Sequence, residues 1–159
     1  SAFETHTCTP RGKYFPVSNQ FVTYVDAGRV VRATPDGRAD GDPLCDSCGA
    51  IHGRDTEGPT AMLSSTAALR LSKALGSPVT NLRMAKEHLS TLLLPLLSAF
   101  FAEGGMQLQI TCASREELLD ALDHPEKHAS LIVRIGGYSE YFNRLSPELK
   151  QSVIARTEY

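Results

Sequence analysis

The amino-acid sequence predicts one globular domain that combines α-helices with β-strands. A chain of 159 residues is long enough for one hydrophobic core and too short for two comfortable domains. Hydrophobic residues make up 42% of the chain and charged residues 21%, as in an ordinary soluble globular protein. Runs rich in β-branched residues and segments with helix-capping signals both occur, which indicates both element types.

The first third of the chain predicts a β-hairpin between two irregular segments. Residues 1–20 are polar, contain proline and glycine, and show little periodicity. Residues 21–25 and 29–33 are β-rich and are separated by Asp-Ala-Gly, which is typical of a hairpin. Residues 34–59 are dense in Pro, Gly and Asp and predict a loop. A loop of this length in a compact domain is usually functional or covered by a partner.

Two helices are predicted in the middle of the chain. Pro59 suits the first turn of a helix that runs to about residue 75 and is ended by Gly76. A second helical region covers about residues 82–103, with an interruption near Pro95. Its apolar residues are too continuous for an amphipathic surface helix, so we expect this region to be buried on most sides.

The C-terminal third alternates predicted strands and helices. Residues 106–111 alternate apolar and polar side chains and predict a strand. Ser114 opens a capping box that begins a short helix ending near residue 123. Residues 131–135 have the composition of a buried strand, and Ser146 followed by proline begins the last helix.

Charge and hydropathy restrict the expected partners and location. The net charge of -2 gives no reason to expect nucleic acid or an anionic membrane as a partner. The most apolar run, residues 92–101, is shorter than a membrane span, and residues 1–10 lack the basic start and apolar core of a signal peptide. We therefore expect a cytoplasmic protein without nucleic-acid or membrane partners.

The cysteines leave two interpretations open. Four are present, and Cys45 and Cys48 have the spacing of metal ligands. A tetrahedral zinc site needs a second close pair, which Cys8 and Cys112 do not supply because they lie far apart. The sequence favours small buried or loop cysteines without a metal. The alternative is a non-enzymatic module that binds a metal through Cys45 and Cys48.

Searches for acid–base chemistry find little. The sequence contains no P-loop, dinucleotide fingerprint or nucleophile elbow. Its five histidines form no metal motif, because Pro125 falls between His124 and His128 in a predicted turn. His52 and Asp55 form a charged cluster on the long loop, where a surface ion pair contributes little. These residues are interpreted as solvated or locally bonded.

Gly136 and Gly137 directly follow the predicted strand 131–135 and precede Tyr138. Such a pair usually marks a turn, a bulge or a place that needs bare backbone, because glycine loses the most freedom on folding. A glycine Cα can also hold an unpaired electron, since loss of one hydrogen leaves a radical shared with the adjoining amide and carbonyl. A side chain would oppose the flattening that this sharing requires. The residues alone leave both uses open.

A resemblance favours the radical. The segment VRIGGYSEYFNRLSPELKQSVIARTEY resembles the C-terminal signature of glycyl radical enzymes, a family that includes pyruvate formate-lyase, glycerol and propanediol dehydratases, choline trimethylamine-lyase and 4-hydroxyproline dehydratase. Its pattern is Arg-Val-x-Gly-Tyr, with the radical on the glycine before tyrosine. The resemblance implies that Gly137 is the radical residue. It also implies that an activating enzyme recognises the loop residues Arg134, Ile135, Gly136, Tyr138 and Ser139, with Ile135 in place of valine.

Further blocks are similar to the same family in the same order. They are ATPDGRADGDPL (33–44), GRDTEGPTAMLSS (53–65), GGMQLQ (104–109) and HPEKHASLIVR (124–134). The resemblance therefore covers nearly the whole chain from about residue 12 onward. We expect residues 1–159 to form one glycyl radical domain whose radical loop region is 131–145. The resemblance implies an α/β architecture, namely the C-terminal section of a ten-stranded barrel with the radical loop directed toward its centre.

The resemblance also implies partners. Family members need a cysteine in a Gly-Cys-x-Glu loop, which the radical converts to a thiyl radical, and none of the cysteines here has that context. We therefore expect a larger subunit or an upstream domain to carry the cysteine in an anaerobic lyase or dehydratase. An activating enzyme that uses S-adenosylmethionine and an iron–sulfur cluster would generate the radical; this chain itself would bind no cofactor.

An alternative within the family is a stand-alone replacement part for an oxygen-damaged enzyme, although such proteins resemble only the last third of this chain. This chain departs from the family pattern at residues 43–50. Dehydratases commonly have Pro-Leu-Ala-Asp-Gly followed by Ser-Pro there, whereas this chain has Pro-Leu-Cys-Asp-Ser-Cys-Gly-Ala.

Overall fold

The computed structural model describes residues 22–69, 72 and 78–159. Its elements begin with α2 (Thr23–Val30), α3 (Pro59–Ala67) and the strand β1 (Val79–Arg83). The short helix η2 (Lys86–His88) and the helix α4 (Leu89–Ala102) lead into β2 (Gln107–Thr111), which is followed by α5 (Arg115–Asp123). The chain continues with β3 (Ile132–Arg134), β4 (Ser139–Tyr141), η3 (Phe142–Arg144) and α6 (Pro147–Ala155). The predicted segment 1–20 lies outside the described residues.

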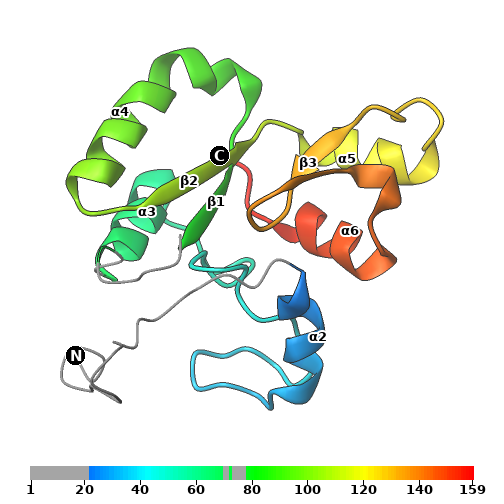
Figure 1. Ribbon diagram of the computed structural model, residues 1–159, viewed down its shortest axis with the longest axis horizontal. Helices are drawn as coiled ribbons and strands as arrows, with labels where there is room; N and C mark the ends of the chain where they lie inside the picture. Colours follow the sequence, from blue (N-terminus) through cyan, green and yellow to red (C-terminus); the bar gives the residue numbers. More distant parts are fainter. Residues whose placement is uncertain (1–21, 70–71, 73–77) are drawn as a thin grey trace, which may run out of the picture.

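Two small sheets organise these elements. β1 and β2 are parallel, with Val79 opposite Gln107 and Arg83 opposite Thr111, and α4 makes the connection between them. β3 and β4 form an antiparallel hairpin. Figure 1 shows α3 and α4 on one side of the β1–β2 pair, and the hairpin with α5 and α6 on the other. The mixture of helices and strands agrees with the predicted α/β class.

Each side of the β1–β2 pair has its own hydrophobic cluster. The first cluster joins α3, β1 and α4 and contains Met62, Leu63, Leu82, Leu96 and Phe100. The second joins α5, the hairpin, η3 and α6, and is built from Leu118, Ala121, Val133, Ile135, Phe142, Val153 and Ile154. Burial of these side chains is the main driving force that holds the hairpin on the body of the molecule.

Several predicted elements are confirmed. α3 begins at Pro59, β2 and β3 lie within the predicted strands, and α5 is capped by Ser114, whose hydroxyl accepts from the Glu117 amide at 3.1 Å. α6 begins as predicted at Ser146-Pro147. The segment 34–58 contains neither helix nor strand, so the long loop is confirmed as well.

The predicted hairpin at residues 21–33 is wrong, because Thr23–Val30 form the helix α2. Tyr24, Val25 and Gly28 are buried on one face of that helix, and the Tyr24 hydroxyl lies 2.8 Å from the Ser152 hydroxyl of α6. These tertiary contacts override the strand propensity of the sequence. Gly28 makes no turn; a Cβ there would overlap the Asp42 carbonyl oxygen, so glycine allows the long loop to pack against the helix.

The predicted helix boundaries also need correction. α3 ends at Ala67 and does not reach residue 75, while residues 70–71 and 73–77 lie outside the described part. The region predicted as helix from residue 82 begins as β1, whose side chains pair with β2, and α4 starts at Leu89. α4 continues through Pro95 without interruption.

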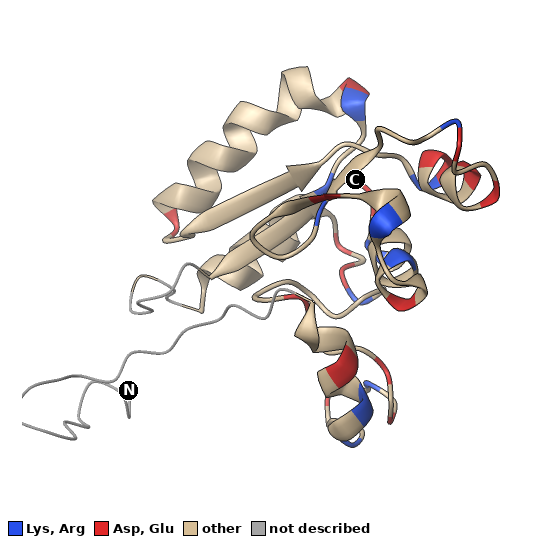
Figure 2. Cartoon of the chain, turned by 45° about the vertical axis from the view of Figure 1, so that its right-hand side comes forward, with Lys and Arg blue, Asp and Glu red and all other residues tan. Residues whose placement is uncertain are grey.

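The expectation that the second helix is buried on most sides is wrong for this chain. Leu96 and Phe100 of α4 are buried, whereas Leu94 is 74% exposed and Phe101 49% exposed. The helix contacts α3, and its buried Leu96 and Phe100 share a cluster with Leu82 of β1. Figure 2 shows no charged residue along its length. Among the described residues, no helix has the length and apolar character needed to cross a membrane.

Candidate functional site

The glycine pair forms the two-residue turn of the β3–β4 hairpin. Arg134 pairs with Ser139, and the Ile135 amide donates to the Tyr138 carbonyl at 3.0 Å, which closes the hairpin around Gly136 and Gly137. Gly137 has a φ of 101°, in the left-handed region that glycine adopts at little cost and other residues avoid. The structure therefore brings the predicted loop residues together at one tip.

The tip is anchored on one side and open on the other. Ile135 is fully buried in the second cluster and Gly136 is buried beside it, but Gly137 is exposed. The neighbouring Tyr138 is half-buried, and Tyr141 is exposed beneath the Arg144 guanidinium, which lies 5.0 Å from its ring. Any further cover for Gly137 comes from beyond the described residues.

Gln109 of β2 links the hairpin tip to the parallel sheet. Its side chain is 5% exposed. With the amide oriented so that its oxygen faces the hairpin, this oxygen accepts from the Gly137 amide at 3.3 Å, from the Arg134 guanidinium at 3.2 Å and from Gln107 Nε2 at 2.9 Å. A buried acceptor with three donors is well satisfied and fixes the position of the Gly137 amide.

Arg134 closes the hairpin from its outer side. Its Nη1 donates to the Ser139 hydroxyl at 2.8 Å, so the guanidinium bridges the two strands as well as reaching Gln109. The pair is exposed, and we assign it a modest contribution to stability.

A second anchor comes from Arg156, which follows α6. Its Nη1 donates to the Arg134 carbonyl at 2.7 Å, and its Nη2 donates to the Ile135 carbonyl at 3.4 Å. The same Nη2 lies 2.9 Å from Asp46 Oδ2, and both side chains are more than nine-tenths buried. The carbonyls at the end of β3 are thereby bonded to a buried ion pair.

The surroundings of Asp46 oppose its ionisation in part. Burial raises the pKa of this carboxyl, while the charges of Arg156 and His52 and a hydrogen bond from Asn81, at 3.2 Å, act in the other direction. Burial also lowers the pKa of His52, which favours the neutral imidazole. These groups lie where the long loop, β1 and the C-terminal segment meet.

The last residues of the chain are held beside β1. The Tyr159 amide donates to the Arg83 carbonyl at 3.1 Å, and the Ala85 amide donates to the Tyr159 carbonyl at 2.7 Å. The Tyr159 hydroxyl donates to Asp55 Oδ2 at 2.7 Å, and burial together with this carboxylate raises the pKa of the phenol. The C-terminal segment that carries Arg156 therefore has a fixed path.

Comparison with known proteins identifies the family. The sequence pattern of the family described as "Glycine radical" matches residues 45–143, more than half of the chain. The chain belongs to the glycyl radical family. The match includes the hairpin and its glycine pair, as well as β1, β2 and Gln109.

Relatives and solved structures agree with this assignment. The chain is 36% identical to "Probable dehydratase YbiW" of Escherichia coli over 93% of its own length and 19% of that protein. It is 38% identical to an "Isethionate sulfite-lyase" of Desulfovibrio desulfuricans over 87% of its length and 18% of that protein. The glycerol-bound B12-independent glycerol dehydratase from Clostridium butyricum superposes with a TM-score of 0.89 and 32% identity, over 99% of this chain and 21% of that one.

A Roseburia inulinivorans protein solved in a study of 1,2-propanediol dehydration gives a TM-score of 0.84 with 36% identity, over 99% of this chain and 20% of that one. The glycyl radical domain therefore has the α/β fold of its family and spans about a fifth of the length of these relatives.

Three of the cysteines lie within the described residues of the glycyl radical domain, and none of them forms a disulfide there. Cys45, Cys48 and Cys112 are free thiols, and burial raises the pKa of Cys45, with Asp46 adding to the shift. Among the described residues, no group of three His, Cys, Asp or Glu side chains could hold a metal ion. Cys8 lies outside those residues.

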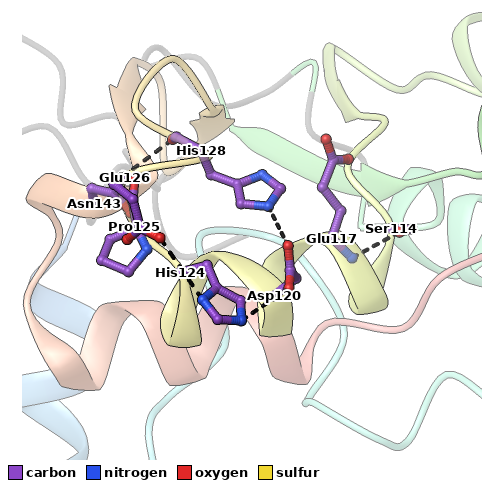
Figure 3. Close-up of polar contacts among 8 residues, drawn as sticks. All are labelled: Ser114, Glu117, Asp120, His124, Pro125, Glu126, His128 and Asn143. Carbon is purple, nitrogen blue, oxygen red and sulfur yellow. Dashed lines mark hydrogen bonds and ion pairs between the residues drawn. The ribbon is translucent and has the colours of Figure 1, made fainter.

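The histidines near the hairpin act in local structure. Figure 3 shows His128 pointing to Asp120 of α5, with Nε2 and Oδ2 2.6 Å apart. Asn143 reaches into the turn before β3 and donates to the Pro125 carbonyl at 2.7 Å. The hydrogen bond from His128 holds the pKa of the Asp120 carboxyl below its usual value. The interpretation of His128 as locally bonded is confirmed.

Sequence reasoning missed the residues that hold the tip. Gln109 lies in a predicted strand. The alternation of apolar and polar residues indicates on which face of that strand its side chain lies, but not that it contacts Gly137 in the β3–β4 hairpin. Asp46 and Arg156 carry no local signal, because their pairing joins segments from opposite ends of the chain. The block resemblance around residues 33–65 was the available hint, since it extended the match far beyond the glycine loop.

Proposed function

We propose that this glycyl radical domain stores an unpaired electron on Gly137 and serves as the radical-bearing part of an anaerobic lyase or dehydratase. The observation that carries the proposal is the geometry of the hairpin tip in a chain of this family. Gly137 is at the turn, has a positive φ, is exposed, and has its amide fixed by Gln109. A strand-end turn alone would not need a buried glutamine on the amide of its glycine.

The proposed chemistry needs two hydrogen-atom transfers. In activation, one hydrogen atom leaves the Gly137 Cα for an acceptor radical supplied by an activating enzyme, which uses S-adenosylmethionine and an iron–sulfur cluster. In turnover, the Gly137 radical takes a hydrogen atom from a cysteine thiol, so that the glycine C–H bond forms again and a thiyl radical remains. The chain's own contribution is to position the radical carbon.

The activating enzyme would grip the exposed side of the hairpin. Arg134, Tyr138 and Ser139 flank Gly137 there, while Ile135 and Gly136 face the core. An exposed tip is open to an activating enzyme and to a reacting thiol alike. We assign Arg134, Tyr138 and Ser139 to the accessible part of the recognition loop, and Ile135 and Gly136 to its buried part, which holds the loop in place.

The reacting thiol would come from beyond the domain. None of the four cysteines lies in a Gly-Cys-x-Glu sequence, and the domain spans about a fifth of its relatives. We infer that a larger chain or an upstream region carries this cysteine and completes a ten-stranded barrel around the hairpin. The exposed apolar face of α4 supports such an association, because apolar patches of this kind mark interaction surfaces.

Anaerobic activation followed by electron paramagnetic resonance tests the proposal. We expect a doublet from the remaining α-hydrogen of Gly137, and we expect it to collapse to a singlet when the protein is labelled with α-deuterated glycine. This isotope control leaves the fold unchanged. Gly137→Ala removes the signal, and air then cleaves wild-type protein at residue 137 but leaves the variant intact. A spin-silent wild-type protein that survives air after treatment with a competent activating enzyme would overturn the proposal.

Mixing experiments separate the arrangements within the proposal. Substrate turnover on addition of a chain that carries the Gly-Cys-x-Glu loop indicates a subunit of a split enzyme. Recovery of activity by an oxygen-cleaved glycyl radical enzyme indicates a replacement part. Either outcome keeps the radical on Gly137.

A further inference from the structure

The ion pair between Asp46 and Arg156 is the feature that the proposed function leaves unexplained. Two opposite charges are removed from water here. Such pairs contribute little to stability over apolar packing, whereas the loss of one partner is strongly destabilising. The presence of this buried ion pair therefore needs an explanation other than stability. That explanation lies in where the remaining donors of Arg156 point.

Arg156 directs its donors at the two carbonyl groups just before the glycine pair. Nη1 bonds the Arg134 carbonyl at 2.7 Å and Nη2 bonds the Ile135 carbonyl at 3.4 Å. The Ile135 carbonyl belongs to the peptide group that enters Gly136. The guanidinium is planar, so fixing both carbonyls on it fixes the direction in which the chain enters the turn.

Asp46 in turn fixes the guanidinium. Its Oδ2 lies 2.9 Å from Nη2 of Arg156 and accepts from Asn81 Nδ2 at 3.2 Å. Asn81 is on β1, opposite Gln109 of β2 in the parallel pair. The β1–β2 sheet therefore holds the hairpin by two routes. Gln109 of β2 binds the Gly137 amide, and Asn81 of β1 binds Asp46, which holds Arg156 against the carbonyls before the glycine pair.

A comparison with Arg38 isolates what is special about Arg156. Arg38 is also buried and also donates to backbone carbonyls, including those of Val31 at 2.8 Å and Arg32 at 2.6 Å. Within the described part of the chain, its hydrogen bonds all end on carbonyls between residues 28 and 42, in or close to α2 and the long loop. Arg38 therefore stabilises its own loop, whereas Arg156 connects two distant segments to the turn.

We propose that Asp46 and Arg156 form a clamp that positions Gly137 for radical formation and for hydrogen transfer. This inference rests on the proposed function for the role of Gly137, but the clamp itself is a statement about the hairpin and can be measured without a radical. Both are positioning residues, because neither touches the reacting carbon. The clamp also makes the long loop, through Asp46, a part of the radical site.

Amide hydrogen exchange in the protein before activation tests the clamp directly. In Arg156→Gln we expect the exchange of the Ile135 and Gly137 amides to accelerate at least tenfold, while amides of α5 stay within threefold of wild type. Asp46→Asn, which is milder, gives the same pattern with a smaller factor. Arg38→Gln is the matched control: it removes a buried arginine and leaves the Ile135 and Gly137 amides at wild-type rates. Equal acceleration in α5 and in the hairpin, or unchanged hairpin exchange in both clamp variants, would overturn the clamp.

The double variant tests whether the two residues act as one unit. If they do, Asp46→Asn combined with Arg156→Gln accelerates hairpin exchange no more than Arg156→Gln alone. If the acceleration factors of the two single variants multiply in the double variant, the residues act independently, which would contradict a shared clamp.

Spectra of the activated protein then connect the clamp to the radical. We expect both clamp variants to show a broadened doublet and at least a fivefold lower spin yield, with Arg38→Gln at the wild-type yield. Altered exchange with an unaltered doublet and yield would show a clamp without a role in positioning the radical, and would overturn the proposal. Absence of a radical in wild-type protein would reject the proposed function instead, while the exchange result would still decide whether the clamp exists.

Discussion

The two sides of the β1–β2 pair differ in how much of their apolar surface this chain buries. On one side the β3–β4 hairpin is fixed by a buried cluster, by Gln109 and by the clamp of Asp46 and Arg156. On the other side α4 packs with Leu96 and Phe100 and leaves the rest of its apolar surface uncovered. The chain thus holds its glycine turn by its own contacts, and leaves open the surface where a larger body would pack.

The largest expected difference between the two sides comes from their phenylalanines. Phe142 is fully buried under the hairpin, so Phe142→Ala should lower the free energy of unfolding by about 4 kcal/mol. Phe101 on α4 is 49% exposed, so the matched change Phe101→Ala should cost far less. Urea unfolding measures both. Similar losses in the two variants would contradict the difference between a side whose apolar surface is buried and a side whose apolar surface is exposed.

The next largest effect is expected at Gln109. Gln109→Met keeps the approximate volume but removes the acceptor of the Gly137 amide and of Arg134, which should destabilise the protein by about 2 kcal/mol. Gln151→Met makes the same change on an exposed position of α6 and should be nearly neutral. Thermal unfolding of the pair gives the difference. Equal midpoints would show that the hairpin does not depend on this acceptor.

A smaller effect, with a defined pH dependence, is expected at the C-terminal tyrosine. Because the pKa of Tyr159 is raised in the folded protein, its contribution to stability is present below the ordinary tyrosine value of 10 and is lost as pH rises through the folded value. Tyr159→Phe should unfold with a weaker alkaline dependence and lose about 1 kcal/mol at neutral pH. Denaturation followed from pH 8 upward checks this. An unchanged alkaline slope would mean that the hydroxyl does not hold the C-terminal segment.

The smallest effect on stability is expected on the open face of α4. Leu94 is 74% exposed, so Leu94→Gln should change the free energy of unfolding by less than about 0.5 kcal/mol. The same variant should self-associate less and bind a larger cysteine-bearing chain more weakly. Analytical ultracentrifugation, alone and with that chain, measures both. A strongly destabilised Leu94→Gln would show that the face is already packed.

The parts of the fold that the sequence predicted are those with local causes. Ser114 and Ser146 cap helices by bonding amides a few residues away, and the strand 131–135 with its glycine pair follows from composition and turn chemistry. α2 and β1 were mispredicted because distant contacts decide them. Tyr24 bonds α6 across the molecule, and β1 is a strand because β2 lies beside it.

The candidate site divides in the same way. The residues of the turn could be named from the resemblance, whereas Gln109, Asp46 and Arg156 required coordinates, because no spacing in the sequence indicates which carbonyl a distant arginine will bond. The continuous apolar run of α4 predicts burial on most sides, but this chain buries only Leu96 and Phe100. The apolar composition alone does not indicate which side chains of the run the chain itself buries.

The open tip of the hairpin has a practical consequence for the isolated protein. With the Gly137 backbone exposed, dissolved oxygen needs no opening of the fold to reach it. We therefore expect the spin of an activated sample to decay without a lag and at a rate proportional to oxygen concentration. The lifetime of the radical in purified protein would therefore depend on how completely oxygen is excluded.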